Sequence, residues 1–171
     1  MQTFLRSLRL FAMVVWVGGL IFFAFVVAPV AFHRLPSAHE AGLVVGGTLR
    51  VLHWIGLVSG GVFCVATVLL RLQAEVSARV GFAIQLVLTG LMLAGTAYSQ
   101  FSLLPAMEVD RALAGGAVET ASADNAGRLD FERLHVVSER LEGFILFCGL
   151  GVVFVLSREA PWSETSKIDR A

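Results

Sequence analysis

Side chains able to bind protons or metal ions recur on one predicted helix face near the carboxyl end of the chain. They are His135, Ser138, Glu139 and Glu142. Their spacing of three and four residues aligns side chains along one face of an α-helix. Imidazole and carboxylate groups can hold a metal ion or exchange protons, and a carboxylate can also pair with arginine. The same segment continues into an apolar run from Gly143 to Leu156, so the polar face leads into a predicted membrane span.

Glu142 is the residue of this set that most needs a partner. The apolar run after it is about 21 Å long at about 1.5 Å per residue, whereas the hydrocarbon core of a bilayer is about 30 Å thick. We therefore expect Glu142 to lie within the hydrocarbon, where ionisable groups normally face the bundle interior with a partner. Arg50 lies at a similar predicted height on another span, and we predict it as that partner, with His53 and His135 alongside.

The composition is that of an integral membrane protein. Of 171 residues, 57% are apolar and only 15% are charged, whereas soluble domains carry about a quarter of charged residues. The formal net charge is zero and the sequence has no long basic run, which excludes nucleic acid as a plausible partner. The expected partners are the lipid bilayer, other membrane helices or further copies of the chain, and small molecules.

Four long apolar segments predict an all-α fold, a four-helix membrane bundle. The predicted spans cover about residues 10–32, 43–70, 80–104 and 135–157. Residues 1–9 are predicted to form a short tail and residues 158–171 a polar cytoplasmic tail. Pro105 is expected to end the regular helix of the third span, because proline disfavours helical backbone before it.

The distribution of basic residues predicts the orientation. The two tails and the second connection together hold seven Lys and Arg residues, against four in the connections on the other side. Because basic residues concentrate on the cytoplasmic side, both termini are predicted to be cytoplasmic. Arg outnumbers Lys twelve to one, a bias that favours a GC-rich bacterial genome and hence the inner membrane.

The two halves of the chain share a pattern that suggests two copies of a helix pair. The first span ends in Val-Ala-Pro at residues 27–29, and the third ends in Leu-Leu-Pro at residues 103–105. Copies related by an axis along the membrane normal would bring His53 and His135 towards each other. Their predicted heights differ by about 7 Å, which argues against strict equivalence.

Small residues within the second span predict close helix packing. Gly56 and Gly60 form a small-xxx-small pattern, which lets a neighbouring helix approach closely. Cys64 and Cys148 lie singly within apolar spans, and we interpret both as small buried residues rather than as a redox pair.

Several short motifs, taken together, resemble one known family. They are Trp16-Val17-Gly18-Gly19, Arg50-x-Leu-His53-x-x-Gly56, Pro105-x-Met107 and Phe131-x-x-Leu134-His135-x-x-Ser138. The chain resembles the transmembrane protein 205-like family, domain of unknown function 4149, over most of its length. This resemblance implies a small four-span membrane protein and supplies no catalytic residues. The layout is more distantly similar to the copper resistance protein D domain and to membrane-type protoporphyrinogen oxidase, in which histidines near helix ends serve metal or haem.

Three functions follow from these residues. In the first, an Arg50, Glu139 and Glu142 network fixes helix register in a structural or assembly bundle. In the second, His53 and His135 bind a metal ion such as copper, or haem, because imidazole suits both. In the third, Glu142 titrates along the path of a small solute or ion. We do not expect an enzyme, because the sequence shows no nucleophile with an identifiable base.

Overall fold

The computed structural model describes residues 1–74 and 79–159, and this part of the chain is helical without strands. Four helical segments are long and apolar enough to cross a membrane: Gln2–Arg34, Ala38–Leu72, Arg79–Leu113 and Ala126–Ser157. The predicted all-α, four-helix membrane fold is thereby confirmed. Residues 160–171 of the predicted cytoplasmic tail and residues 75–78 of the second connection lie outside the described residues.

Each membrane-length segment is built from one or more labelled elements. The first contains α1 (Gln2–Phe22), the π-helical turn η1 (Phe23–Val27) and α2 (Ala28–Arg34), and the second is α3 (Ala38–Leu72). The third contains α4 (Arg79–Tyr98), the π-helical turn η3 (Ser99–Leu103) and α5 (Leu104–Leu113). A short 3-10 turn, η4 (Val118–Thr120), precedes the last helix, α6 (Ala126–Ser157). The helices extend beyond the predicted spans, and residues 2–9 are helical rather than a tail.

Both prolines within the spans follow a π-helical turn. Pro29 comes just after η1 and Pro105 just after η3. Proline lacks a backbone N–H and its ring clashes with the carbonyl four residues earlier. A wider π turn changes the local hydrogen-bond ladder at such a position. The helix therefore continues through Pro105 to Leu113, and the prediction that Pro105 ends it is wrong. The same kind of turn thus occurs in the first and third segments.

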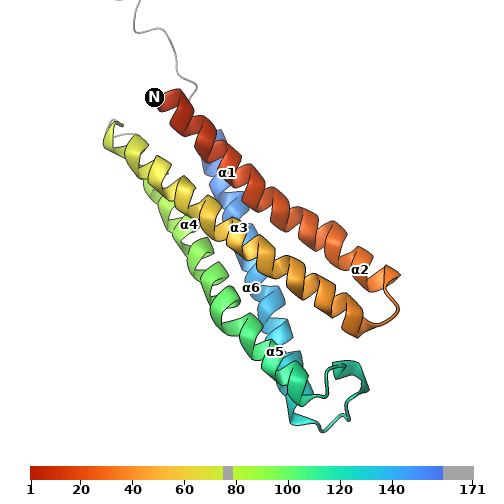
Figure 1. Cartoon of the computed structure of the whole chain (residues 1–171). Coiled ribbons are helices and arrows are strands. Elements are labelled where there is room, and N and C mark those ends of the chain that lie inside the picture. Colours follow the sequence, from red (N-terminus) through yellow and green to blue (C-terminus); the bar gives the residue numbers. More distant parts are fainter. Residues whose placement is uncertain (75–78, 160–171) are drawn as a thin grey trace, which may run out of the picture.

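The bundle consists of two helix hairpins that meet at one end and diverge at the other (Figure 1). The α1–α2 segment packs along α3, and the α4–α5 segment packs along α6. We call the end where α2 and α5 lie the open end, and the end with the N-terminus the closed end. Arg9 of α1 contacts Glu159 just after α6, so both ends of the described chain lie at the closed end.

Close packing between α1 and α3 depends on two glycines. A Cβ atom at Gly56 would overlap the indole of Trp16, and one at Gly60 would lie 2.5 Å from it. The predicted small-residue packing face is thereby confirmed. Around this contact lies a core of fully buried side chains, including those of Met13, Phe63, Met92, Ile145 and Val152.

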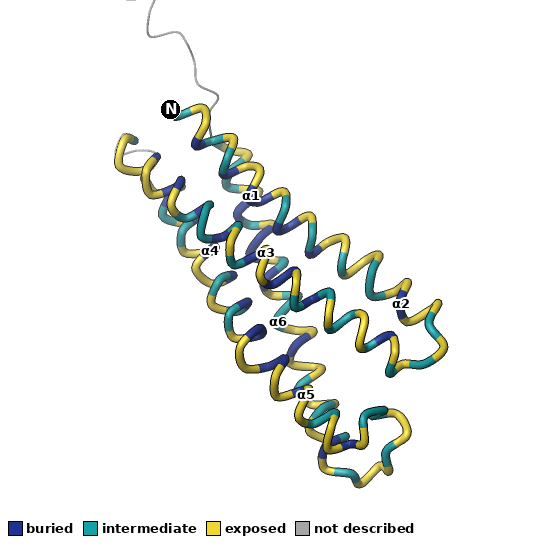
Figure 2. The backbone as a smooth tube through the Cα atoms, viewed as in Figure 1, coloured by how far each residue is buried: buried dark blue, intermediate teal, exposed yellow. Residues whose placement is uncertain are grey.

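The outward faces of the bundle are apolar. Figure 2 shows buried residues along the inner faces of the helices and exposed residues on the outer faces. The most exposed large apolar side chains within the spans include Phe11, Phe25 and Phe147. A soluble bundle would present charged residues on these faces, whereas lipid solvates apolar ones. The chain is therefore a membrane protein.

Candidate functional site

A buried polar cluster joins the two hairpins near the middle of the bundle. His53 of α3 is only 1% exposed, and its Nε2 lies 2.9 Å from Glu142 Oε1 of α6. The Ser99 hydroxyl donates to the same carboxylate oxygen at 3.0 Å. His53 Nδ1 lies 3.1 Å from the Gln100 side-chain oxygen. Three membrane-length helices thus contribute to one hydrogen-bonded group.

The π-helical turn η3 places two consecutive polar residues in this cluster. Ser99 and Gln100 are both buried, although successive residues of a regular α-helix diverge by about 100° around its axis. Because a π turn inserts an extra residue per turn, both side chains reach the interior. Sequence reasoning did not select these two residues. The signal that could have found them is a polar pair shortly before Pro105 in an otherwise apolar span.

Arg50 is not the partner of Glu142, so this part of the predicted network is wrong. Arg50 pairs with Glu108 of α5 at 2.7 Å, and both side chains are about half exposed. His53 takes the predicted place of Arg50 beside Glu142. The predicted heights along the helix axes placed Arg50 and His53 level with Glu142. The orientation of α3 about its own axis, however, directs only His53 into the core.

The structure separates the two histidines that were predicted as metal ligands. His135 precedes Glu142 by two helical turns, about 10 Å along the axis. It contacts Glu139 at 3.3 Å and stacks on Phe131. Within residues 1–74 and 79–159, no three His, Cys, Asp or Glu side chains are grouped to hold a metal ion. His53 would also have to leave its hydrogen bonds to become a ligand, so the geometry gives the metal hypothesis no support.

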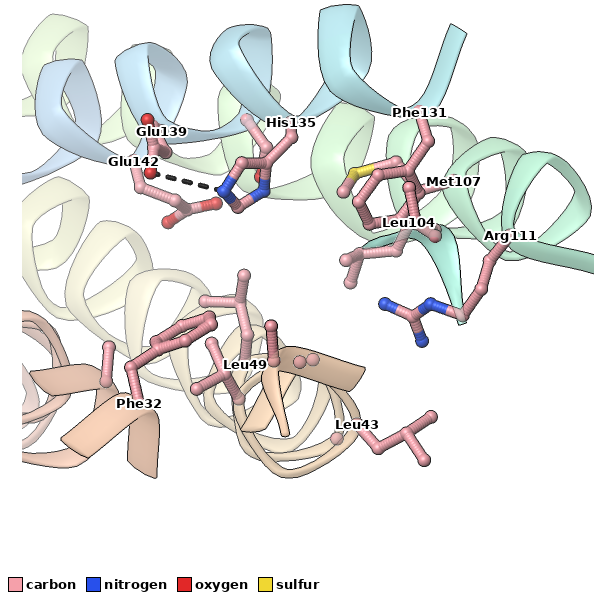
Figure 3. Close-up of a pocket in the computed structure, with 18 of the residues that line it drawn as sticks. Phe32, Leu43, Leu49, Leu104, Met107, Arg111, Phe131, His135, Glu139 and Glu142 are labelled. Carbon is pink, nitrogen blue, oxygen red and sulfur yellow. Dashed lines mark ion pairs between the residues drawn. The ribbon is translucent and has the colours of Figure 1, made fainter. Parts of the chain in front are cut away.

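A cavity of about 730 Å³ separates the hairpins at the open end. Figure 3 shows side chains of α5 and α6 on one side of this space and side chains of α2 and α3 on the other. The walls are largely apolar and include Leu20, Phe23, Phe32, Leu49, Leu104 and Met107. Glu142 and the buried Ser138, two of the residues predicted from the sequence, line it on α6. We call the part of the cavity beside the His53–Glu142 contact its floor.

The cavity also contains charged side chains of both signs. Its arginines are Arg50, Arg111 and Arg128, and its glutamates are Glu108, Glu119, Glu132, Glu139 and Glu142. Arg50 pairs with Glu108, Arg128 pairs with Glu132 at 2.9 Å, and Arg111 lies over the ring of Phe131. Glu139 and Glu142 contact histidines instead. Glu142 Oε2 is buried and has no hydrogen-bond partner among the described residues.

The connection between α5 and α6 crosses the mouth of the cavity. Gly115 and Gly116 adopt φ angles of +87° and +95°, which non-glycine residues rarely adopt, and they turn the chain after α5. Glu119 then accepts a hydrogen bond of 2.9 Å from the backbone N–H of His39, at the start of α3. Backbone hydrogen bonds at Glu119 and His39 lower the pKa of the Glu119 carboxyl group below its ordinary value. This contact ties the second hairpin to the first.

A second buried polar cluster lies at the closed end. Arg9 is fully buried and contacts Glu159 at 2.8 Å. Gln85 donates to the same glutamate oxygen at 2.8 Å and accepts a hydrogen bond from Arg9. The guanidinium lies 5.2 Å from the ring centres of both Phe63 and Phe82. Sequence reasoning placed Arg9 in a tail and missed this cluster, which links α1, α4 and the end of α6.

Fold and site together define a class: a four-span membrane bundle with a polar-floored cavity between two helix hairpins. The chain belongs to the family described as domain of unknown function (DUF4149), whose model matches residues 11–110. The match includes His53, Ser99 and Gln100 and stops before α6. No curated protein and no solved structure matched the chain. The comparisons support the DUF4149 part of the resemblance, but not the transmembrane protein 205 name or the likeness to copper resistance protein D.

Proposed function

We propose that this protein binds a small amphipathic molecule in the cavity between its hairpins. The observation that carries this proposal is a cavity of about 730 Å³ whose walls are mostly apolar and whose floor contains the Glu142 carboxylate. Small-molecule sites typically measure about 300–1,000 Å³ and combine apolar walls with a few placed polar groups. The cavity has both the size and the lining of such a site.

The polar groups at the cavity floor support the binding proposal, because placing an ionisable side chain within a membrane costs free energy. An ionisable group at hydrocarbon depth usually marks a ligand or ion site. His53 and Ser99 fix one oxygen of Glu142, so the carboxylate is held in position at the cavity. A binding cavity open at one end of the bundle also suits a transport role, in which the bound solute would enter through that end.

A structural role is the second candidate, and the cluster at the closed end favours it. Arg9, Gln85 and Glu159 join three helices without bordering the large cavity. The His53–Glu142 contact also joins helices, so both clusters can fix helix register in a bundle that assembles with other membrane helices or further copies of itself. The two candidate functions differ in one respect: a purely structural bundle would keep its function when a side chain fills the cavity.

Photolabelling tests binding directly. The probe is a long-chain alcohol carrying a diazirine, applied to protein in lipid nanodiscs with and without excess unlabelled alcohol. Gly46→Trp fills the cavity, because Gly46 lines it and has open space around its Cβ position. Gly90→Trp is the matched control, because Gly90 also has open space but lies outside the cavity.

The result expected is competable labelling of residues 104–111 and 131–146 in the wild type and in Gly90→Trp, with loss of that labelling in Gly46→Trp. Equal labelling of these segments in all three proteins would overturn the binding proposal and leave the structural role.

We infer further that the protein resides in the inner membrane with both termini in the cytoplasm. The excess of basic residues in the tails and second connection supports this orientation, and the contact between Arg9 and Glu159 puts both ends of the described chain on one side. The cavity would then open away from the cytoplasm. Reporter fusions after residue 171 and within residues 114–125 test this: a cytoplasmic reporter should be active only at the first site.

A further inference from the structure

We infer that the cavity selects an amphipathic cation, an inference that rests on the proposed binding function. The lining contains five glutamates and only three arginines. Counting glutamates and arginines alone, the lining thus has two carboxylates more than it has guanidinium groups. The side chain of Glu142 is only 15% exposed, so its charge is weakly screened and favours a positively charged guest over an anion.

The position of the excess charge sharpens the inference. Arg50 and Arg128 are each paired with a glutamate of the lining. Glu139 and Glu142, one helical turn apart on α6, form ion-pair contacts only with histidines among the described residues. Glu142 lies deeper and is the more buried of the two. The uncompensated negative charge therefore lies along α6, at Glu139 and Glu142, where a cationic guest would bind.

Aromatic rings in the lining add to this selectivity. Phe23, Phe32 and Phe131 border the cavity, and the face of an aromatic ring attracts cations. Phe131 already has a cation over its ring, the guanidinium of Arg111, 5.2 Å from its centre. The class of ligand that fits is an organic ammonium or phosphonium ion with an apolar body, its charge directed to Glu142 and its body against the phenylalanine and leucine side chains.

Two probes of nearly the same shape and opposite charge test the inference. They are tetraphenylphosphonium and tetraphenylborate, titrated into nanodisc-embedded protein with empty nanodiscs subtracted. The wild type should bind the phosphonium more tightly than the borate, and Gly46→Trp should abolish the difference. Glu142→Gln should weaken phosphonium binding about tenfold, a ratio equivalent to about 1.4 kcal/mol.

Matched variants separate a local contact from a change in overall charge or folding. Glu132→Gln removes the same charge from a glutamate already paired with Arg128, and should weaken phosphonium binding by less than about threefold. Glu139→Gln alters an exposed side chain, so it should leave the thermal transition unchanged while weakening phosphonium binding. It therefore tests the charge requirement even if Glu142→Gln folds poorly.

Equal affinity for the two probes, or equal weakening by Glu132→Gln and Glu139→Gln, would overturn the inference. If the uncharged diazirine alcohol still labelled the cavity in a competable manner, the binding function would stand and only the preference for cations would be lost. If neither probe nor alcohol responded to Gly46→Trp, both proposals would fail.

Discussion

Removing the Glu142 carboxylate should destabilise the bundle far more than removing the Arg50 guanidinium. Glu142→Ala breaks the hydrogen bonds from His53 and Ser99 and leaves the imidazole, which is 1% exposed, without its acidic partner. Arg50→Ala breaks one ion pair whose side chains are 43% and 56% exposed. The two substitutions remove charges of similar predicted depth but of very different surroundings.

The magnitudes follow from those surroundings. Hydrogen bonds between membrane helices contribute about 0.6 kcal/mol on average and up to about 1.7 kcal/mol, and a buried donor left unpaired costs about 1–3 kcal/mol. We therefore expect Glu142→Ala to cost about 2 kcal/mol, and the exposed Arg50 pair to contribute about 0.5 kcal/mol. In a protein of this size these values correspond to about 4–8 °C and about 1–2 °C in the thermal transition.

The assay is the apparent Tm in mild detergent. It is measured for Glu142→Ala, His53→Ala and the double substitution Glu142→Ala/His53→Ala, which together form a double-mutant cycle. The contact predicts that the two single effects are not additive, with a coupling of about 1 kcal/mol. Additive effects, or a larger loss with Arg50→Ala than with Glu142→Ala, would refute the assignment of His53 as the partner.

Three further predictions concern other parts of the bundle. Gly56→Leu should lower the apparent Tm by several degrees because the new side chain overlaps the indole of α1, whereas Gly90→Leu, in open space, should leave it nearly unchanged. Glu159→Gln should be destabilising because it leaves the buried guanidinium of Arg9 without its counter-charge; adding Arg9→Met should restore part of the loss, and no recovery would contradict the buried pair. The pKa of Glu119 is lower in the folded protein than its ordinary value, so its carboxylate stabilises the fold at the cavity mouth at pH values above the ordinary pKa. This stabilisation is lost as the pH falls through the lower pKa of the folded state. The protection factors of the amides at the start of α3, which are corrected for the intrinsic exchange rate, should therefore fall below about pH 4. A similar fall in Glu119→Gln would exclude this carboxylate as the cause.

Local patterns were sufficient to predict the class and the four membrane-length helices. Apolar runs long enough to cross a bilayer determine the spans, and a carboxylate just inside such a run requires a partner within the bundle. The partner itself could not be predicted, because distance along a helix does not give the rotation about its axis. Arg50 and His53 lie within one turn of each other, yet only His53 faces the core.

Three further features were not predicted from the sequence, each for a different reason. Ser99 and Gln100 face inward together because η3 departs from regular helical spacing. Arg9 looked like part of a basic tail, although it continues the face of α1 that buries Leu5 and Trp16, and this spacing was a usable signal. The cavity results from divergence of the hairpins at the open end, which depends on packing between segments far apart in sequence.

The most direct measurement of the central claim is native mass spectrometry of the protein released from its own membranes, comparing the wild type with Gly46→Trp and Gly90→Trp. Binding in the cavity predicts a small bound molecule that is retained at high collision energy by the wild type and by Gly90→Trp, and that is absent from Gly46→Trp. The same adducts on all three proteins would contradict the claim, because filling the cavity would then have displaced nothing.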